Sequence, residues 1–182
     1  MSLVVGIVLL AVVLLIAMPR GPRPPYLVLD NPALGFRAEY PSELYHGPNY
    51  VKTSAGSILT VERFSLVEPM PATKEFLAGL PDVLFDQVLI QLQENYAYVN
   101  EISRTHLMID GRKGLEVVME GLPAGREPLS TITIDIVGND TWVYVLRSYS
   151  PKTRDAKERP LFAYFRDHFH MTGPQEPPAA PK

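Results

Sequence analysis

The chain has 182 residues, with 17 Lys and Arg against 20 Asp and Glu, so its formal net charge is −3. This balance argues against nucleic-acid binding through a basic face, which needs an excess of Lys and Arg. The chain has no cysteine, which excludes disulfides, thiolate metal sites, a cysteine nucleophile and a lipidated cysteine.

The first 18 residues form an apolar run without a charged side chain. As a helix this run would be about 27 Å long, at the short end of what crosses a bilayer. No basic side chain precedes the run, and residues 16–19 (IAMP) make a poor cleavage site. We therefore expect a retained transmembrane anchor rather than a cleaved signal peptide.

Two proline-rich segments bracket the rest of the chain. Residues 19–25 (PRGPRPP) predict a stiff spacer, because proline cannot continue a helix. Residues 173–182 contain four prolines and predict a disordered tail. Residues 26–172 lie between these segments and are enough for one globular domain.

The first part of this domain predicts strands. Residues 26–30 (YLVLD) fit a short strand, and residues 34–41 alternate apolar and charged side chains until Pro41 ends the strand. Residues 50–67 predict two further strands, joined by a turn near residues 54–57 (SAGS).

Residues 71–99 change to helical spacing, with four large apolar side chains on one stripe. These are Phe85, Leu89, Leu92 and Tyr96. Because Gly79 and Pro81 interrupt the pattern, we expect a short helix from about Thr73 and then a break. The main helix would begin at Asp82, whose carboxylate would cap it.

The remainder predicts two hairpins and a closing helix. Residues 101–121 fold at Asp110-Gly111, a dipeptide that tolerates the positive φ angles of a tight hairpin turn. Residues 131–150 fold at 138–140 (GND), after a stretch in which isoleucines alternate with Thr and Asp. Residues 159–171 predict a helix with Pro160 in its first turn.

This order predicts an α+β fold in which an antiparallel β-sheet packs with two amphipathic helices. With its landmarks, the order resembles the PsbP-like family, whose fold is shared with the Ran-binding protein Mog. The landmarks, within residues 34–171, are the strand ending in Tyr40-Pro41, the long central helix, the Asp110-Gly111 hairpin, the aromatic strand at 142–144, and the closing helix with Phe165 and Phe169. The resemblance implies an α/β/α sandwich and a non-catalytic role as an accessory or docking subunit; the best-known member serves the photosynthetic water-oxidising complex.

We expect no catalytic, cofactor-binding or metal-binding residue, because the sequence has no motif for an activated serine, a phosphate or a dinucleotide. Asp167, His168 and His170 resemble a metal site, but on a helix the two imidazoles would point about 200° apart. Histidines at that position are better explained by the helix dipole. Asp82 and Asp86 are likewise better explained as carboxylates at a helix start.

Tyr45, His46 and Tyr50 lie in a segment rich in Gly and Pro, of the kind that contacts a ligand or partner. The alternative is that they are solvent-exposed turn residues. We expect His106 on the solvated face of its strand and Trp142 in packing rather than on a ligand platform.

Together these features predict a non-enzymatic, single-pass membrane protein, anchored in the bilayer through residues 1–18. Its domain would bind an integral-membrane protein complex, such as a photosynthetic or respiratory complex. The alternative is a tethered module that binds a small ligand or an envelope component in an apolar pocket between the helix 82–98 and the strand 141–149. The side of the membrane stays open, because Arg20 and Arg23 favour the cytoplasm while the resemblance favours the extracytoplasmic side.

Overall fold

The computed structural model describes residues 25–65, 74–124, 128–138 and 141–173, without the side chains of residues 74–78. The expected anchor (1–18), most of the spacer and nearly all of the tail lie outside these residues. In the part of the chain that the structure describes, no helix is long and apolar enough to cross a membrane.

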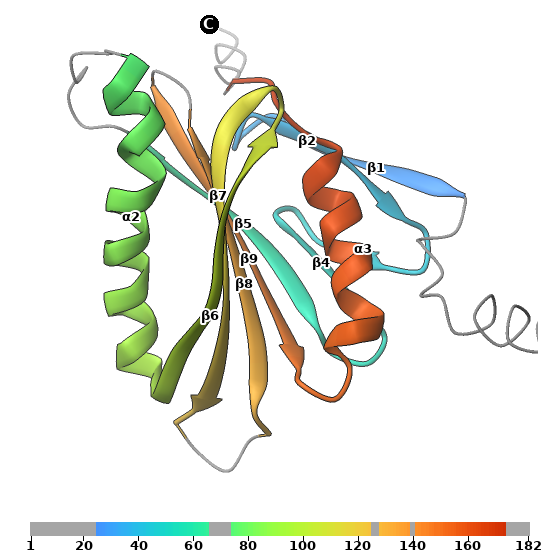
Figure 1. Ribbon diagram of the computed structural model, residues 1–182. Coiled ribbons are helices and arrows are strands. Elements are labelled where there is room, and N and C mark those ends of the chain that lie inside the picture. Colours follow the sequence, from blue (N-terminus) through green and yellow to red (C-terminus); the bar gives the residue numbers. More distant parts are fainter. Residues whose placement is uncertain (1–24, 66–73, 125–127, 139–140, 174–182) are drawn as a thin grey trace, which may run out of the picture.

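Within these described residues, ten strands form two antiparallel sheets, and two helices pack against them (Figure 1). The large sheet has the order β3-β4-β5-β9-β8-β7-β6 and the small sheet has the order β1-β2-β10. The elements are β1 (Tyr26–Asn31), β2 (Phe36–Pro41), β3 (Tyr45–His46), β4 (Tyr50–Lys52), β5 (Ile58–Ser65), α2 (Lys74–Asn95), β6 (Tyr96–Ile109), β7 (Arg112–Pro123), β8 (Ser130–Gly138), β9 (Trp142–Pro151), α3 (Asp155–Asp167) and β10 (Phe169–Met171).

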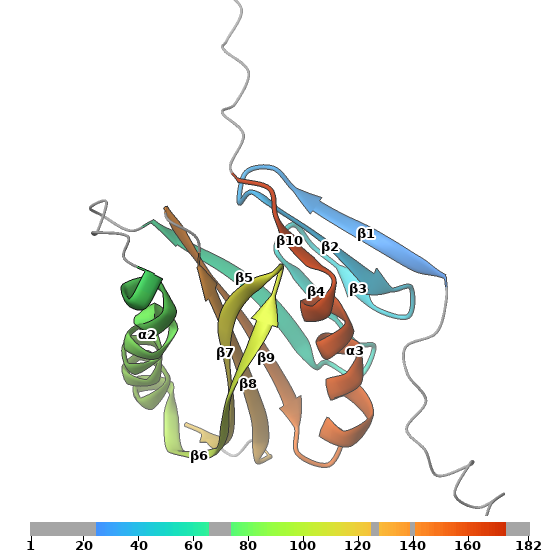
Figure 2. The same ribbon diagram turned by 45° about the horizontal axis from the view of Figure 1, so that its top comes forward.

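The helix α2 covers one face of the large sheet, and α3 with the small sheet covers the other (Figures 1 and 2). The α2 side is aliphatic, since the alternating isoleucines of β8 and Val143 and Val145 of β9 pack under Phe85 and Leu92. The α3 side is more aromatic, with Phe36, Tyr144, Phe165 and Phe169 fully buried. The predicted α+β fold with an antiparallel sheet and two helices is therefore confirmed.

The helix α2 differs from its prediction, because it runs unbroken from Lys74 to Asn95 through Pro81. Proline removes one backbone hydrogen bond, and here Leu80 and Phe85 bury apolar surface on both sides of Pro81 in the same cluster. That packing outweighs the local cost, since tertiary contacts supply most helical stability. Asp82 consequently lies inside the helix and is not its cap.

The closing helix also differs from its prediction. The helix α3 begins at Asp155 rather than at residue 159, so Pro160 lies within it and not in its first turn. It ends at Asp167, and Phe169 belongs to β10, where it pairs with Ala38 of β2. The Phe169 ring stacks on Phe36 with 5.3 Å between centroids. Pairing with β2 and stacking on Phe36 therefore place Phe169 in a strand, although its spacing from Leu161 and Phe165 is helical.

Both predicted hairpins are present. Asp110 and Gly111 adopt φ angles of 50° and 70°, as a tight hairpin turn requires, and they join β6 to β7. The strands β8 and β9 pair along their length, while residues 139–140 of the predicted turn lie outside the described residues. The strand β6 begins at Tyr96, directly after α2, whereas the prediction placed this residue on the helix.

Candidate functional site

The large sheet is wider than α2, so part of its α2-side face is open. Alternation along the paired strands β3, β4, β5 and β9 places one set of side chains on this open part of the sheet. From the register these are Tyr45, Tyr50, Lys52, Ile58, Thr60, Glu62, Phe64, Arg147 and Tyr149. We call this set the open face. It includes Tyr45 and Tyr50, two of the three residues predicted to contact a ligand or partner.

The structure separates the three predicted contact residues. Tyr45 is 60% exposed and pairs with Lys52, so both side chains lie on the open face. Tyr50 is half-buried on the same face, and its ring covers Gly47, where a Cβ atom would lie 2.2 Å from a ring carbon. His46 points to the opposite face, 5.6 Å from the Tyr40 ring. Only the two tyrosines therefore share a surface.

An apolar pocket of about 190 Å³ lies where the open face meets α2. Its lining residues come from α2, β5 and β9: Phe64, Ser65, Leu84, Gln87, Val88, Gln91, Val143 and Val145. None of these side chains is charged, and the polar ones are one hydroxyl and two amides. The pocket therefore suits an uncharged, largely apolar group with one or two hydrogen-bonding atoms.

Next to this pocket, Arg147 and Glu62 form a partly buried ion pair, with 3.3 Å between Nη2 and Oε2. The Nε atom of Arg147 is buried and has no hydrogen-bond partner among the described residues. Burial raises the pKa of the neighbouring Tyr149 hydroxyl, against the opposing effect of Arg147. Arg147 and the Tyr149 hydroxyl therefore supply hydrogen-bond donors on the open face, and Glu62 supplies an acceptor.

On the α3 side, the structure reveals a charged cluster that the sequence analysis missed. Arg166 of α3 binds Glu116, and its Nη1 lies 3.5 Å from Oδ1 of Asp135 on β8. Burial raises the pKa of Asp135 to about 7, with Glu116 adding to the effect and Arg166 opposing it. The sequence feature that could have indicated this cluster is Asp135 itself, an aspartate among isoleucines and threonines in residues 131–136. Because α3 covers Asp135, which is only 5% exposed, the cluster fastens the helix and offers no route to a substrate.

The histidines near the C-terminal end do not come together. His168 Nδ1 lies 2.9 Å from the Tyr164 carbonyl, and its ring stacks on Tyr164. His170 Nδ1 lies 3.0 Å from Asp110 Oδ1. Both residues lie past the last residue of α3, so the expected helical spacing does not apply to them. Across the described ranges, no group of three His, Asp or Glu side chains is placed to hold a metal ion.

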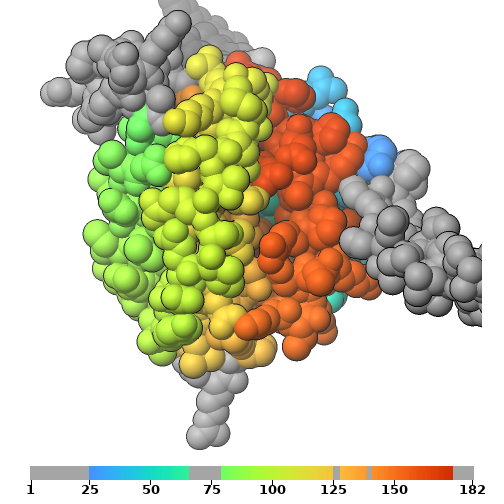
Figure 3. Space-filling view, in the orientation of Figure 1, coloured from blue at the N-terminus to red at the C-terminus, as the bar shows by residue number. Residues whose placement is uncertain are grey.

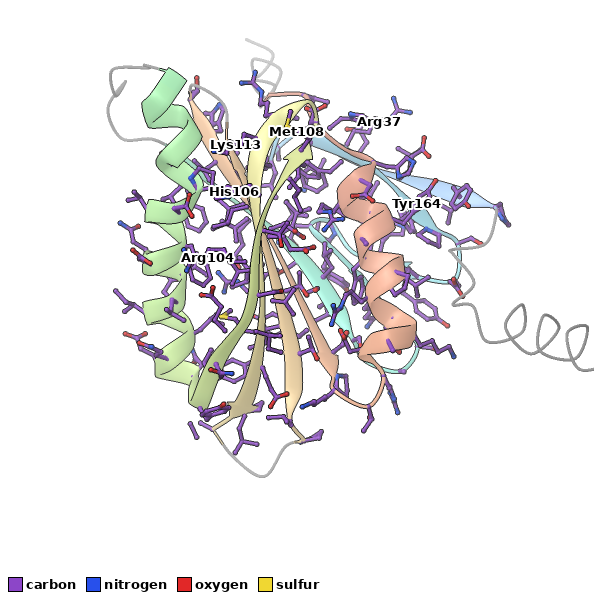
Figure 4. The ribbon with its side chains drawn as sticks, in the orientation of Figure 1. Arg37, Arg104, His106, Met108, Lys113 and Tyr164 are labelled. Atoms are coloured by element: carbon purple, nitrogen blue, oxygen red, sulfur yellow. The ribbon has the colours of Figure 1, made fainter. Side chains whose placement is uncertain are left out.

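Two further residues weighed from the sequence meet at α2. Arg104 and His106 project from β6 toward this helix (Figure 4). The two side chains share the Asp82 carboxylate, at 3.6 Å for Arg104 and 3.1 Å for His106. The Arg104 guanidinium also lies over the Phe85 ring, 4.7 Å from its centroid. Asp82 therefore ties α2 to the edge strand. Asp86 is exposed on the same helix.

No protein-family model matches the chain, and no curated protein matches its sequence. Among solved structures, the chain is similar to cyanobacterial PsbP (CyanoP) from Synechocystis sp. PCC 6803, with a TM-score of 0.56 and 13% identity over 80% of this chain and 92% of that one. It also matches a protein of unknown function from Pseudomonas aeruginosa, with a TM-score of 0.49 and 11% identity over 72% of this chain and 88% of that one. The similarity to LpqN of Mycobacterium tuberculosis, described as involved in cell envelope biogenesis, has a TM-score of 0.45 and 8% identity over 85% of this chain and 83% of that one. The last two scores are too low to define a shared fold. The similarity to CyanoP shows that the chain has the PsbP-like fold.

Proposed function

We propose that this protein is a non-enzymatic, membrane-anchored accessory or docking subunit that binds an integral-membrane protein complex. The observation that carries the proposal is the uncharged apolar run of residues 1–18 and its short link to the domain. The PsbP-like fold supports the accessory class of function by analogy. It does no more than that, because a fold alone does not establish an activity.

The length of the link argues for a membrane-bound partner. Seven spacer residues at roughly 3 Å each hold the first strand within about 20 Å of the bilayer. A domain held this closely meets membrane proteins far more often than soluble ones, because tethering raises the effective concentration. The open face, with Tyr45 and Tyr50, is the surface that we assign to the partner; tyrosines supply large contact area at low entropic cost.

Gentle solubilisation tests this proposal. Membranes are extracted with a mild detergent, and the native protein is followed by native electrophoresis. We expect migration with a large complex, and loss of that migration in the Tyr45→Asp variant. Ile90→Asp is the matched control, because Ile90 is 61% exposed but lies on the outer face of α2. A lone monomer in every mild detergent would contradict the proposal.

Protease protection on sealed vesicles, followed by the mass of the N-terminal peptide, determines two further parts of the proposal. It shows on which side of the membrane the domain lies, and whether residues 1–18 are retained. Release of a soluble chain that begins after Pro25 would remove the basis of the anchor.

A second candidate function rests on the apolar pocket beside α2. It lies between the helix and the strand that the sequence analysis named for a ligand site. At about 190 Å³ it is smaller than a typical drug-sized pocket of roughly 300–1,000 Å³, so it fits a small molecule or one end of a longer one.

A ligand of this pocket would stabilise the fold, because a molecule that binds only the folded state raises the melting temperature. We expect a protein-poor cell-extract fraction to raise Tm, and Ser65→Phe at the pocket rim to abolish that rise. Ile90→Phe is the control that should retain it. A Tm unchanged by every fraction would count against this second function.

A further inference from the structure

The first half of β1 forms an exposed apolar tip at one corner of the molecule. Tyr26, Leu27 and Val28 are 38%, 44% and 46% exposed, while Leu29 is only 5% exposed. Successive side chains of a strand point to opposite faces, so the tip exposes apolar surface on both faces of the small sheet, although Tyr26 is partly covered. The strand β1 is also the edge of that sheet, next to β2 (Figure 2).

The tip is held rigidly by α3. The Tyr26 ring stacks on Tyr164 with 4.6 Å between centroids and 7° between planes, and Tyr164 stacks in turn on His168 at 3.9 Å. The Tyr164 hydroxyl lies 3.4 Å from Glu39 Oε2. Figure 4 shows Tyr164 on the side of α3 that faces the small sheet. The tip therefore presents its tyrosine in a fixed position, without a loss of conformational freedom on binding.

The charges near the tip do not favour an anionic surface. On β1 and β2 the outward side chains next to Val28 are Asp30, Arg37 and Glu39, so one cation faces two carboxylates. Binding driven by anionic lipids needs a clear excess of Lys and Arg. An apolar tip with a tyrosine instead suits the interfacial zone of a bilayer, where aromatic rings have one apolar and one hydrated end.

The position of the tip in the chain indicates what it contacts. The apolar run ends at Met18 and only the seven-residue spacer separates it from Tyr26. We propose that Tyr26, Leu27 and Val28 enter the interfacial zone of the bilayer that holds residues 1–18, in a manner independent of anionic lipid. This inference rests on the proposed anchor. The helix α2 and the strand β1 lie at opposite edges of the molecule (Figure 3). Contact through β1 would therefore orient the domain with α2 turned away from the membrane.

Labelling at a single cysteine tests this orientation, because the chain has no native cysteine. Full-length Val28→Cys carries an environment-sensitive fluorophore and is reconstituted into phosphatidylcholine vesicles with nitroxide-bearing lipids. Ile90→Cys on α2 is the matched control, since Ile90 is also exposed. We expect several-fold stronger quenching at position 28 than at position 90, unchanged by high salt or by added phosphatidylglycerol. Adding Leu27→Asp should reduce quenching at position 28 to the level of the control.

The outcomes separate this inference from the proposed anchor. If alkaline carbonate releases the protein from the vesicles, the anchor itself is wrong. If the protein stays with the vesicles but position 28 is quenched no more than position 90, the anchor stands and the tip does not contact the bilayer. Quenching that requires phosphatidylglycerol would overturn the apolar mode of contact. If the Leu27→Asp variant does not fold, the comparison of quenching at positions 28 and 90 still shows whether the tip contacts the bilayer.

Discussion

The aspartate under α3 makes the stability of the domain depend on pH in an unusual direction. Asp135 has a pKa of about 7 in the folded protein, against an ordinary value of 3.8. Between these values the folded state keeps a proton that the unfolded chain releases, so Asp135 stabilises the fold at acidic pH and this stabilisation is lost as the pH rises through 7. From these two pKa values, the free energy of unfolding falls by roughly 2–3 kcal/mol between about pH 5 and about pH 8.

The substitution Asp135→Asn removes this titration while keeping the shape of the side chain and an acceptor for Arg166. Across the same pH range we expect the free energy of unfolding of the variant to fall by roughly 2–3 kcal/mol less than that of the parent protein. Urea unfolding of the full-length chain in a mild detergent, followed by circular dichroism at several pH values, measures the difference.

The matched control for this measurement is Glu120→Gln. Glu120 lies on β7 and pairs with the exposed Lys152, so its removal should leave the pH profile unchanged. The reasoning is refuted if the parent and Asp135→Asn profiles run parallel between about pH 5 and about pH 8.

Three further substitutions test the packing. Phe85→Ala should cost about 3–5 kcal/mol of unfolding free energy, because it removes a fully buried ring from under α2; a cost within error would contradict the assigned core. Glu158→Ala should cost about 1–3 kcal/mol, because it leaves the buried hydroxyls of Ser57 and Thr53 without their shared acceptor; Glu158→Gln should cost less, and equal losses would argue against that role. Gly121→Ala should cost about 1–3 kcal/mol, because its Cβ atom would lie 2.8 Å from the Tyr96 ring and 2.9 Å from Ile132. A Gly121→Ala variant as stable as the parent protein would contradict this reasoning. Urea unfolding measures all these free energies.

The sequence was sufficient for the features that depend on local rules. Alternation along residues 131–136 placed the three isoleucines of β8 on one face and its Thr and Asp side chains on the other, because a strand has a period of two. The structure shows that the isoleucine face is the one under α2. Asp110-Gly111 identified the β6–β7 turn for a similar reason, since few dipeptides tolerate two positive φ angles. A pocket does lie between the central helix and the aromatic strand, with Phe64 and Ser65 of β5 also in its lining, and that it binds a ligand stays a prediction.

The predictions failed where distant contacts decide. Pro81 remains inside α2 because the flanking side chains pack on a sheet that lies far along the chain. Phe169 leaves the helical pattern because β2 offers it a pairing partner. Asp135 meets Arg166 only after α3 packs on the sheet. The expectation that Tyr45, His46 and Tyr50 contact a ligand or partner stays a prediction. The structure shows that His46 faces the opposite side of the sheet from the two tyrosines, as adjacent residues of a strand do.

The three-stranded sheet joins the beginning of the domain to its end, and this has a consequence for biosynthesis. The strand β2 is synthesised early in translation, but one of its two edges can pair only after β10 has been made. Phe36 therefore lacks its stacking partner Phe169 until almost the whole chain has been synthesised. A nascent protein therefore leaves the ribosome with aromatic surface uncovered, and pairing that depends on distant segments folds slowly. Chains that stop before Phe169 should accordingly be substrates for chaperones and proteases, whereas chains that stop after Gly173 should mature normally.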